Sequence, residues 1–386
     1  MTVNTLSESQ MQGHRRGAAS GILPSQTLRE LIADGQIRAE APIGEEQVQP
    51  ASIDLRLGQF AYRVRASFMP GPNATVQEKI DRFAMHRIDL SAGAVLERGC
   101  VYIVPLQERL HLDPPMTGVA NPKSSIGRLD IFTRLITDNA TEFERVRPGY
   151  RGPLYLEIAP RTFSVVVRTG SRLNQLRLRR GAAAASDSAT RRLHRRIGLV
   201  DRDPADANIA NGLALSVDLS GTGERSGNGG PIGFKARKHA GLIDVDLKDH
   251  YDPAEFWEPI HARSDEGIIL NPDDFYILAS KEAVTIPPDH AAEMVAYDTL
   301  VGEFRVHYAG FFDPAFGYTP AGGARTRAVL EVRSHEVPFL LQDGQIVGRL
   351  IYERMLEVPD KLYGTGIGSS YQRQGLKLGK QFRAWG

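Results

Sequence analysis

The chain has 386 residues, of which 41% are hydrophobic and 24% charged, values typical of a folded globular protein with two or three domains. Its 47 basic and 46 acidic residues nearly cancel, and this balance argues against general nucleic-acid binding. No apolar run approaches the roughly 18–20 residues of a membrane span, and the first residues lack the apolar core of a signal peptide. We therefore expect a cytoplasmic protein without a membrane partner.

The predicted elements are mostly short strands. Residues 1–20 are polar and aperiodic, as is typical of a flexible tail. Apolar residues then recur on one helical face, which predicts a short helix from Ser25 to Gly35. β-branched and aromatic runs follow, separated by Gly, Pro and Asp, and this pattern favours a β-sandwich or barrel. The expected strands are 52–57, 101–105, 154–158, 164–167, 275–278, 328–332 and 347–352.

Between the two groups of strands, the composition changes abruptly to Ala, Ser and Arg. Seven arginines fall between Arg177 and Arg196, a density that also suits a phosphate or RNA contact. No aromatic side chains are interleaved for base stacking. We therefore interpret residues 181–212 as a solvated linker, and we expect no nucleic-acid partner.

The two halves of the chain repeat one another. Tyr102 aligns with Tyr276 at an offset of 174 residues, and Leu156-Glu157 aligns with Leu330-Glu331 at the same offset. Several matches in one register indicate a tandem duplication of one β-rich domain. The expected parts are a flexible tail (1–20), a first barrel (21–180), the Arg/Ala-rich linker (181–212), a second, partly degenerate barrel (213–358) and a C-terminal lid segment (359–386).

The two copies differ in charge at one segment. The first copy has the sequence KSSIGR at residues 123–128, whereas the aligned residues 297–302 of the second copy contain an acid and no cation. Arginine binds phosphate oxygens through two parallel hydrogen bonds, lysine adds a point charge, and small hydroxyls donate at close range. The pattern predicts one phosphate-binding segment per chain.

Five segments together resemble the dCTP deaminases of the trimeric dUTPase-like superfamily. They are QPASIDLRLG (49–58), NPKSSIGRL (121–129), RPGYRGPLYLE (147–157), GSRLNQL (170–176) and SSYQRQG (369–375). The resemblance implies a mainly β protein built of duplicated dUTPase-like β-barrel (β-clip) domains with few short helices. It also implies self-association, as a homotrimer or another assembly whose barrels total a multiple of three.

The resemblance further implies hydrolytic deamination of dCTP to dUTP and ammonia. Mg²⁺ would be bound through the nucleotide triphosphate, and the protein itself would hold no zinc or other metal. Glu157 resembles the catalytic general base, and Arg128 and Ser124 resemble the residues around the reacting water and the nucleotide. The implied nucleotide-binding residues are Lys123, Ser125 and Gln175, together with Tyr363 and Gln374 of the lid.

The chemistry agrees with a zinc-free reaction. Zinc deaminases use an H-x-E and P-C-x-x-C arrangement, which the single cysteine of this chain, Cys100, excludes. A partly buried carboxylate can instead take a proton from water and return it to the base. Glu157 lies in the apolar run 154–158, so we expect it on a strand.

The role of the second copy remains open at this point. Arg147 precedes a Pro-Gly pair where the family has Asp, whereas the second copy has Asp313 before Pro314. Glu331 is either a relic or completes a site with the KSSIGR segment of the first copy. The alternative functions are a dUTP pyrophosphatase, a bifunctional enzyme that makes dUMP from dCTP, and a non-catalytic nucleotide-binding protein.

Overall fold

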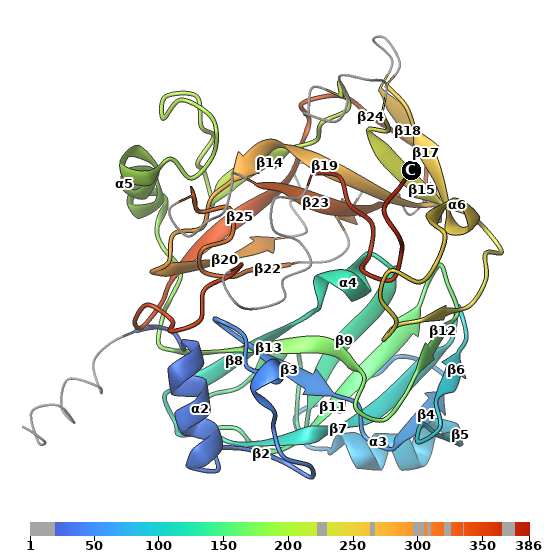
Figure 1. Ribbon diagram of the computed structural model, residues 1–386. Helices are drawn as coiled ribbons and strands as arrows, with labels where there is room; N and C mark the ends of the chain where they lie inside the picture. Colours follow the sequence, from blue (N-terminus) through green and yellow to red (C-terminus); the bar gives the residue numbers. More distant parts are fainter. Residues whose placement is uncertain are drawn as a thin grey trace, which may run out of the picture.

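The protein is described here by a computed structural model, which covers residues 20–221, 230–262, 267–295, 305–306, 310–319, 326–334, 336–364 and 375–386. Two β-barrels lie against each other, with the first copy in the lower half of Figure 1 and the second in the upper half. The helices described are α2 (Ser25–Ala33), α3 (Val76–Phe83), α4 (Ser124–Gly127), α5 (Asp187–Ile197) and α6 (Pro253–Phe256), with a 3-10 turn at Glu45–Gln47. The fold is mainly β with few short helices, as predicted.

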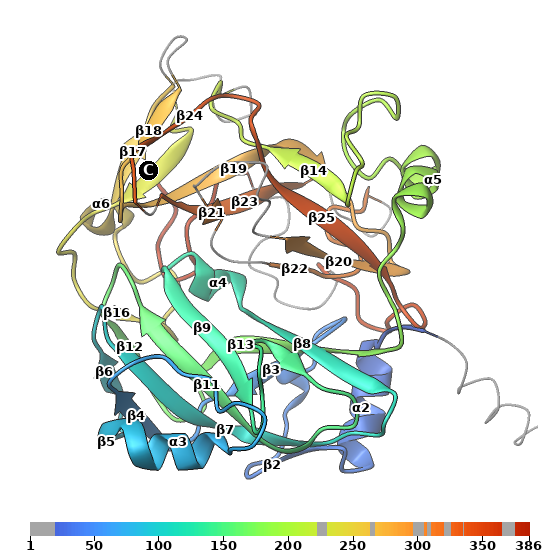
Figure 2. The same cartoon turned by 180° about the vertical axis from the view of Figure 1, so that it is seen from behind.

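Three sheets form the first barrel (Figure 2). One runs in the order β1 (Gly21–Ile22), β13 (Arg172–Arg180), β8 (Met116–Pro122) and β10 (Arg145–Val146), with β3 (Ile53–Arg56) also on β13. The next runs β5 (Ala84–Asp89), β4 (Phe60–Val64), β7 (Val101–His111), β11 (Arg151–Pro160) and β9 (Ile131–Thr137), with β2 (Ile37–Ala39) also on β7. The smallest is β16 (Ile243–Asp244), β12 (Val165–Val167) and β6 (Ala94–Leu96), so a strand from the second half of the chain completes it.

The second barrel repeats this arrangement. Its first sheet runs β14 (Leu213–Ser216), β25 (Ile346–Arg354), β20 (His290–Val295) and β22 (Phe311–Phe312). Its next sheet runs β17 (Trp257–Ile260), β15 (Gly233–Ala236), β19 (Phe275–Val284), β23 (Thr326–Arg333) and β21 (Arg305–Val306). The pair β18 (Ile268–Leu270) and β24 (Phe339–Leu341) forms the smallest.

The duplication predicted from the sequence is confirmed strand by strand. β13 and β25 begin and end 174 residues apart, and so do β6 and β18, and β12 and β24. The pairing is repeated too, because β13 lies beside β8 as β25 lies beside β20, and β7 beside β11 as β19 beside β23. A shared register along with a shared strand order identifies two copies of one barrel.

The Arg-rich segment between the barrels differs from the predicted solvated linker. It forms α5, which Ser186 caps by accepting a hydrogen bond from the Ala189 amide. Leu193 and His194 on this helix are buried, and Leu193 belongs to the hydrophobic core of the second barrel. The four arginines of α5 lie on its exposed face, as in an amphipathic helix, whereas the earlier arginines of the run, from Arg177 to Arg180, belong to β13.

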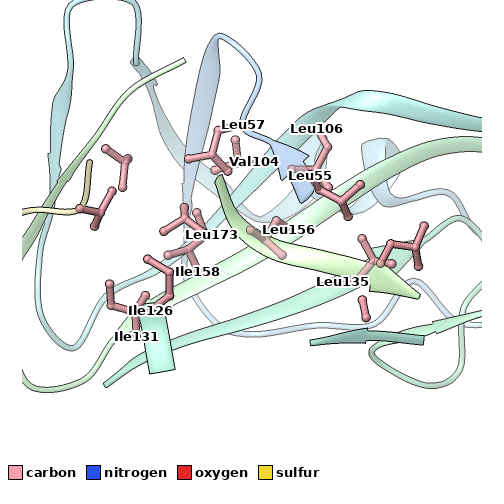
Figure 3. Packing of buried hydrophobic residues seen from close by; sticks show 14 of the residues in the cluster. Leu55, Leu57, Val104, Leu106, Ile126, Ile131, Leu135, Leu156, Ile158 and Leu173 are labelled. Carbon is pink, nitrogen blue, oxygen red and sulfur yellow. The ribbon is translucent and has the colours of Figure 1, made fainter. Parts of the chain in front are cut away.

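A hydrophobic core fills the first barrel and continues past its end. Figure 3 shows the part of this core to which Leu55, Val104, Leu156 and Leu173 contribute. The same cluster also includes side chains of the second copy and of the C-terminal segment, namely Phe234, Phe256, Trp257, Phe275, Leu378 and Phe382. Because no gap in packing separates the copies here, the barrels are fixed relative to each other.

Aromatic rings hold this junction together. The ring centroid of Trp257 lies 5.6 Å from that of Phe163 in the first barrel and 5.8 Å from that of Phe382 near the C-terminus. Both contacts are edge-to-face, an arrangement that adds stability beyond the burial of area. Three distant segments of the chain therefore share one aromatic cluster.

Buried charges also join the barrels. Arg177 on β13 is 1% exposed at its side chain, and its guanidinium donates to the carbonyl oxygens of Ala292 (3.0 Å) and Phe312 (3.4 Å) in the second barrel. Its nitrogens also lie 3.3 Å from a carboxylate oxygen of Glu353 and 3.5 Å from one of Asp313. A guanidinium buried in this way is stabilised only while the second barrel supplies its acceptors.

We expect Arg177→Ala to lower the free energy of unfolding by about 3–5 kcal/mol, because it leaves buried carboxylates without their cation. Urea unfolding followed by the fluorescence of Trp257 and Trp385 measures this change at the junction itself. The control is Arg195→Ala on the exposed face of α5, which should change the free energy by no more than about 0.5 kcal/mol. Equal losses in the two variants would contradict a joining role for Arg177.

Candidate functional site

The predicted phosphate-binding segment forms a single turn of helix at the face of the first barrel. Lys123 precedes α4, Ser124 and Ser125 begin it, and Arg128 follows its last residue. Ile126 is buried in the barrel core, so the turn is anchored from below (Figure 3). Figures 1 and 2 both place α4 where the first barrel faces the second.

Arg128 meets a carboxylate of the second barrel. Its Nε lies 3.8 Å from Oε1 of Glu331 on β23, and both side chains are at least nine-tenths buried. Burial raises the pKa of Glu331 to about 7, while the positive charge of Arg128 acts in the opposite direction. Here the structure brings together the cation of one copy and the Leu-Glu motif of the other.

Glu157 has a different partner from the one expected. It lies on β11 as predicted and is 1% exposed, but it accepts a hydrogen bond of 2.9 Å from Nε of Arg134 on the neighbouring strand β9. Arg134 also donates to Ser67 and lies over the ring of Phe143, with 3.8 Å from its Cζ to the ring centroid. The ion-pair partner of Glu157 is therefore within its own barrel, whereas that of Arg128 is Glu331.

Lys123 and Gln175 lie around an aspartate that our sequence analysis did not single out. Asp54 on β3 forms an ion pair with Lys123, and Nη1 of Arg172 lies 3.9 Å from its Oδ2. Gln175 is directly opposite Asp54 in the β13–β3 pairing, and its side-chain oxygen accepts from Ser52 at 3.3 Å. The PASIDLRLG motif carried the signal, because it places an acid between two buried apolar residues, Ile53 and Leu55.

Further acids of the second barrel face the same region. Burial raises the pKa of Asp313, against the opposing effect of Arg177 and Lys123. Glu293 on β20 accepts a hydrogen bond of 3.4 Å from Asn121, two residues before Lys123. Asp313, whose role the sequence left open, therefore lies near the predicted phosphate-binding segment, although it belongs to the other copy.

The C-terminal segment reaches this site from two directions. The Tyr363 amide donates to the Pro314 carbonyl at 3.0 Å, and its ring lies 5.4 Å from that of Phe316. After the range that includes Gln374, which lies outside the described residues, the chain continues at Gly375. The carbonyl of Lys377 then accepts a hydrogen bond of 3.0 Å from Arg128. Burial, followed by the charge of Lys123, lowers the pKa of Lys380.

An anchoring network holds the chain just before Tyr363. Arg29 on α2 forms ion pairs with Asp360 at 2.6 Å and with Glu45 at 2.7 Å. Lys361 donates to the Val48 carbonyl at 3.0 Å and also pairs with Glu45. The segment that leads to the predicted lid is thus attached to the first barrel.

The described residues offer neither a cluster of metal ligands nor a helix that could span a membrane. That part of the chain contains no group of three or more His, Cys, Asp or Glu side chains placed to hold a metal ion. None of its helices is long and apolar enough to cross a membrane.

Two carboxylates of the second half of the chain are paired with an arginine of the first barrel. Asp244 and Asp246, in the segment GLIDVDL, lie 2.5 Å and 2.7 Å from nitrogens of Arg168. Hydrogen bonding to Arg168 lowers the pKa of Asp244. This pair fixes β16 against the first barrel, which is a structural role.

Comparison with known proteins identifies the family. The family described as "2'-deoxycytidine 5'-triphosphate deaminase (DCD) N-terminal domain" matches residues 19–182, and its C-terminal domain matches residues 186–382. A crystal structure of 2'-deoxycytidine 5'-triphosphate deaminase from Agrobacterium tumefaciens is 57% identical, covers 88% of this chain and 99% of its own, and superposes with a TM-score of 0.82.

Curated relatives match a shorter part of the chain. The dCTP deaminase of Halorubrum lacusprofundi is 28% identical over 159 residues, 40% of this chain and 75% of its own length. The "dCTP deaminase, dUMP-forming" of Pseudarthrobacter chlorophenolicus is 31% identical over 140 residues, 34% of this chain and 70% of its own. Each match is about as long as one barrel. With both of its halves matched in order, the chain belongs to the 2'-deoxycytidine 5'-triphosphate deaminase family.

Proposed function

We propose that this chain hydrolyses dCTP to dUTP and ammonia at a site between its two barrels. The observation that carries the proposal is the contact between Arg128 and Glu331. A buried carboxylate whose pKa lies near 7 is suited to accept and return protons at neutral pH. It stands 3.8 Å from the arginine of the phosphate-binding segment, in a chain of the deaminase family.

In the proposed reaction, the oxygen of a water molecule bonds to C4 of cytosine. Glu331 takes one proton of this water and passes it to N3, and then carries the proton of the new C4 hydroxyl to the amino group. The C4–N bond breaks, ammonia leaves, and uracil remains. Ser124, at the start of α4, is proposed to hold the water or the base beside the carboxylate.

The remaining predicted residues are proposed to bind the nucleotide. Lys123 and Ser125 would contact the triphosphate, which carries Mg²⁺ with it, and the ion pair with Asp54 fixes the position of Lys123. Gln175, Tyr363 and Gln374 are proposed contacts of the nucleotide and lid. Zinc has no step in this proposal.

Glu331 replaces Glu157 as the proposed base. The resemblance implied Glu157 as the base, but its carboxylate forms an ion pair with Arg134 within the first barrel. We propose that Glu157 is a structural ion pair and that each chain has one catalytic site. Assembly into a homotrimer or another multiple-of-three arrangement of barrels, and a cytoplasmic location, stay predictions.

A second candidate is a bifunctional enzyme that forms dUMP. It is supported by the relatives named dUMP-forming, including that of Beutenbergia cavernae, which is 30% identical over 126 residues. This candidate shares the deamination step and adds hydrolysis of the triphosphate.

The first test is a product analysis of the purified protein incubated with dCTP and Mg²⁺. We expect ammonia and dUTP in equal amounts, with no loss of rate in the presence of phenanthroline, because a carboxylate supplies the proton transfer. Release of pyrophosphate with dUMP would establish the bifunctional candidate. Absence of ammonia, or a requirement for stoichiometric zinc, would contradict the proposed deamination.

The second test distinguishes the two glutamates. Glu331→Gln should lower kcat for deamination by about 10²–10⁴-fold, because the amide cannot accept the proton, while affinity for dCTP persists. Glu157→Gln is the matched control, since its side-chain oxygen can still accept from Arg134, and kcat should fall less than about 3-fold. Steady-state kinetics with calorimetric dCTP titration measures both quantities. If Glu157→Gln is the inactive variant, Glu331 is not the base.

The third test follows from the raised pKa of Glu331. A general base is active in its deprotonated form, which predominates above the pKa, so kcat/KM should rise with pH through about 7. Arg128 lowers this pKa, so Arg128→Met should shift the rise to higher pH as well as reduce the rate. The pH profiles of wild type and variant, compared at one Mg²⁺ concentration, cancel the titration of dCTP itself. An unshifted profile in Arg128→Met would argue against coupling of the two groups.

A further inference from the structure

A second group of basic side chains lies on the first barrel, away from the proposed catalytic site. Arg38 on β2, Arg109 and His111 on β7, and Arg151 on β11 line a cavity of about 430 Å³, together with Leu110 and Gly152. Figures 1 and 2 both show β2 and β7 at the end of the first barrel farthest from α4. No step of the proposed reaction uses these residues.

The strand register forces these basic side chains together. Arg38 is directly opposite Arg109 in the β2–β7 pairing, and Arg151 is directly opposite His111 in the β7–β11 pairing. Side chains alternate between the faces of a strand, so Arg109 and His111 share one face. All four are exposed on it. Like charges directly opposite each other, as in the Arg38–Arg109 pair, destabilise a sheet.

These basic side chains have no ion-pair partner in the part of the chain that the structure describes. Arg38 is held by a hydrogen bond of 2.7 Å from its Nε to the carbonyl of Gly35, a neutral acceptor that leaves its charge uncompensated. On the same strand β7, the buried carboxylate of Glu108 pairs with Arg56 at 2.8 Å. The positive charge of the exposed arginines beside it has no such partner.

The lining of the cavity restricts the ligand. Its volume lies in the range of small-molecule sites, roughly 300–1,000 Å³. Guanidinium groups bind phosphate oxygens through paired hydrogen bonds, and several of them suit an anion with more than one phosphate. No Phe, Tyr or Trp is among the lining residues, so nothing there provides a stacking surface for a base. We propose that this cavity is a second anion site, which binds the polyphosphate group of a nucleotide or of inorganic polyphosphate.

The site is tested by calorimetric titration of the full chain with inorganic tripolyphosphate. The Lys123→Ala background weakens the proposed catalytic site, so that binding at the cavity is observed separately. We expect one tripolyphosphate per chain in this background and at least a ten-fold weaker affinity when Arg109→Ala is added. Arg98→Ala removes an equal charge from an exposed turn and should change the affinity less than two-fold.

Two further measurements separate this site from the catalytic one. Arg109→Ala alone should leave kcat/KM for dCTP within two-fold of wild type, and without phosphate its Tm should be equal to or above that of wild type, because repulsion is relieved. Equal affinities for tripolyphosphate and dATP would show that the phosphate chain alone is enough for binding. Tighter binding of dATP would identify a nucleotide as the ligand. Unchanged tripolyphosphate binding in Arg109→Ala, or a loss of dCTP turnover, would overturn the proposal.

Discussion

Opposite charges buried between the two barrels fix how the barrels are oriented relative to each other. The first barrel contributes cations to this junction, chiefly Arg128, Arg177 and Arg179, and the second contributes carboxylates, chiefly Glu331 and Glu353. An exception in the opposite direction is Arg333 of the second barrel, which pairs with Asp130 of the first. Buried charges are tolerated only when paired, so each barrel requires the other in one orientation. The proposed catalytic site is one part of this layer of paired charges.

The duplication has let the two copies become unequal. The first copy keeps the cations of the KSSIGR segment. The glutamate of its own Leu-Glu motif, Glu157, accepts a hydrogen bond from Arg134. The second copy keeps a carboxylate with a raised pKa but has no cation in its aligned segment. Neither barrel alone contains all the groups of the proposed site, because the cations come from the first copy and the carboxylate from the second. In the proposed reaction the two copies therefore complement each other.

Much of this architecture was predictable from the sequence, because it depends on local patterns. The β-branched and aromatic runs between Gly, Pro and Asp indicated the strands, and the constant offset of 174 residues indicated two copies, which β13 and β25 reproduce. KSSIGR was recognisable because Lys, Ser and Arg, which all bind phosphate oxygens, occur within six residues. Residues 181–212 were misjudged because their many arginines obscured the buried face of α5 at Leu193.

The pairing of Arg128 with Glu331 was not predictable in the same way. A sequence shows which residues share a copy, but the contact depends on which faces of two barrels meet. The partner of Glu157 was hidden for a related reason, since Arg134 becomes its neighbour only through the β9–β11 register. The basic cavity likewise arises from strand pairing, because Arg38 and Arg109 are far apart in the sequence.

The covalent connection through α5 has a consequence for how the site behaves on dilution. In an assembly of separate single-barrel subunits, a site shared between barrels disappears once the concentration falls below the dissociation constant. Here a peptide segment of 181–212, packed against the second barrel, keeps the two halves at a high effective concentration that does not depend on the amount of protein. Assembly of the proposed shared site thus becomes part of folding, and we expect it to persist at dilutions at which separate subunits would dissociate.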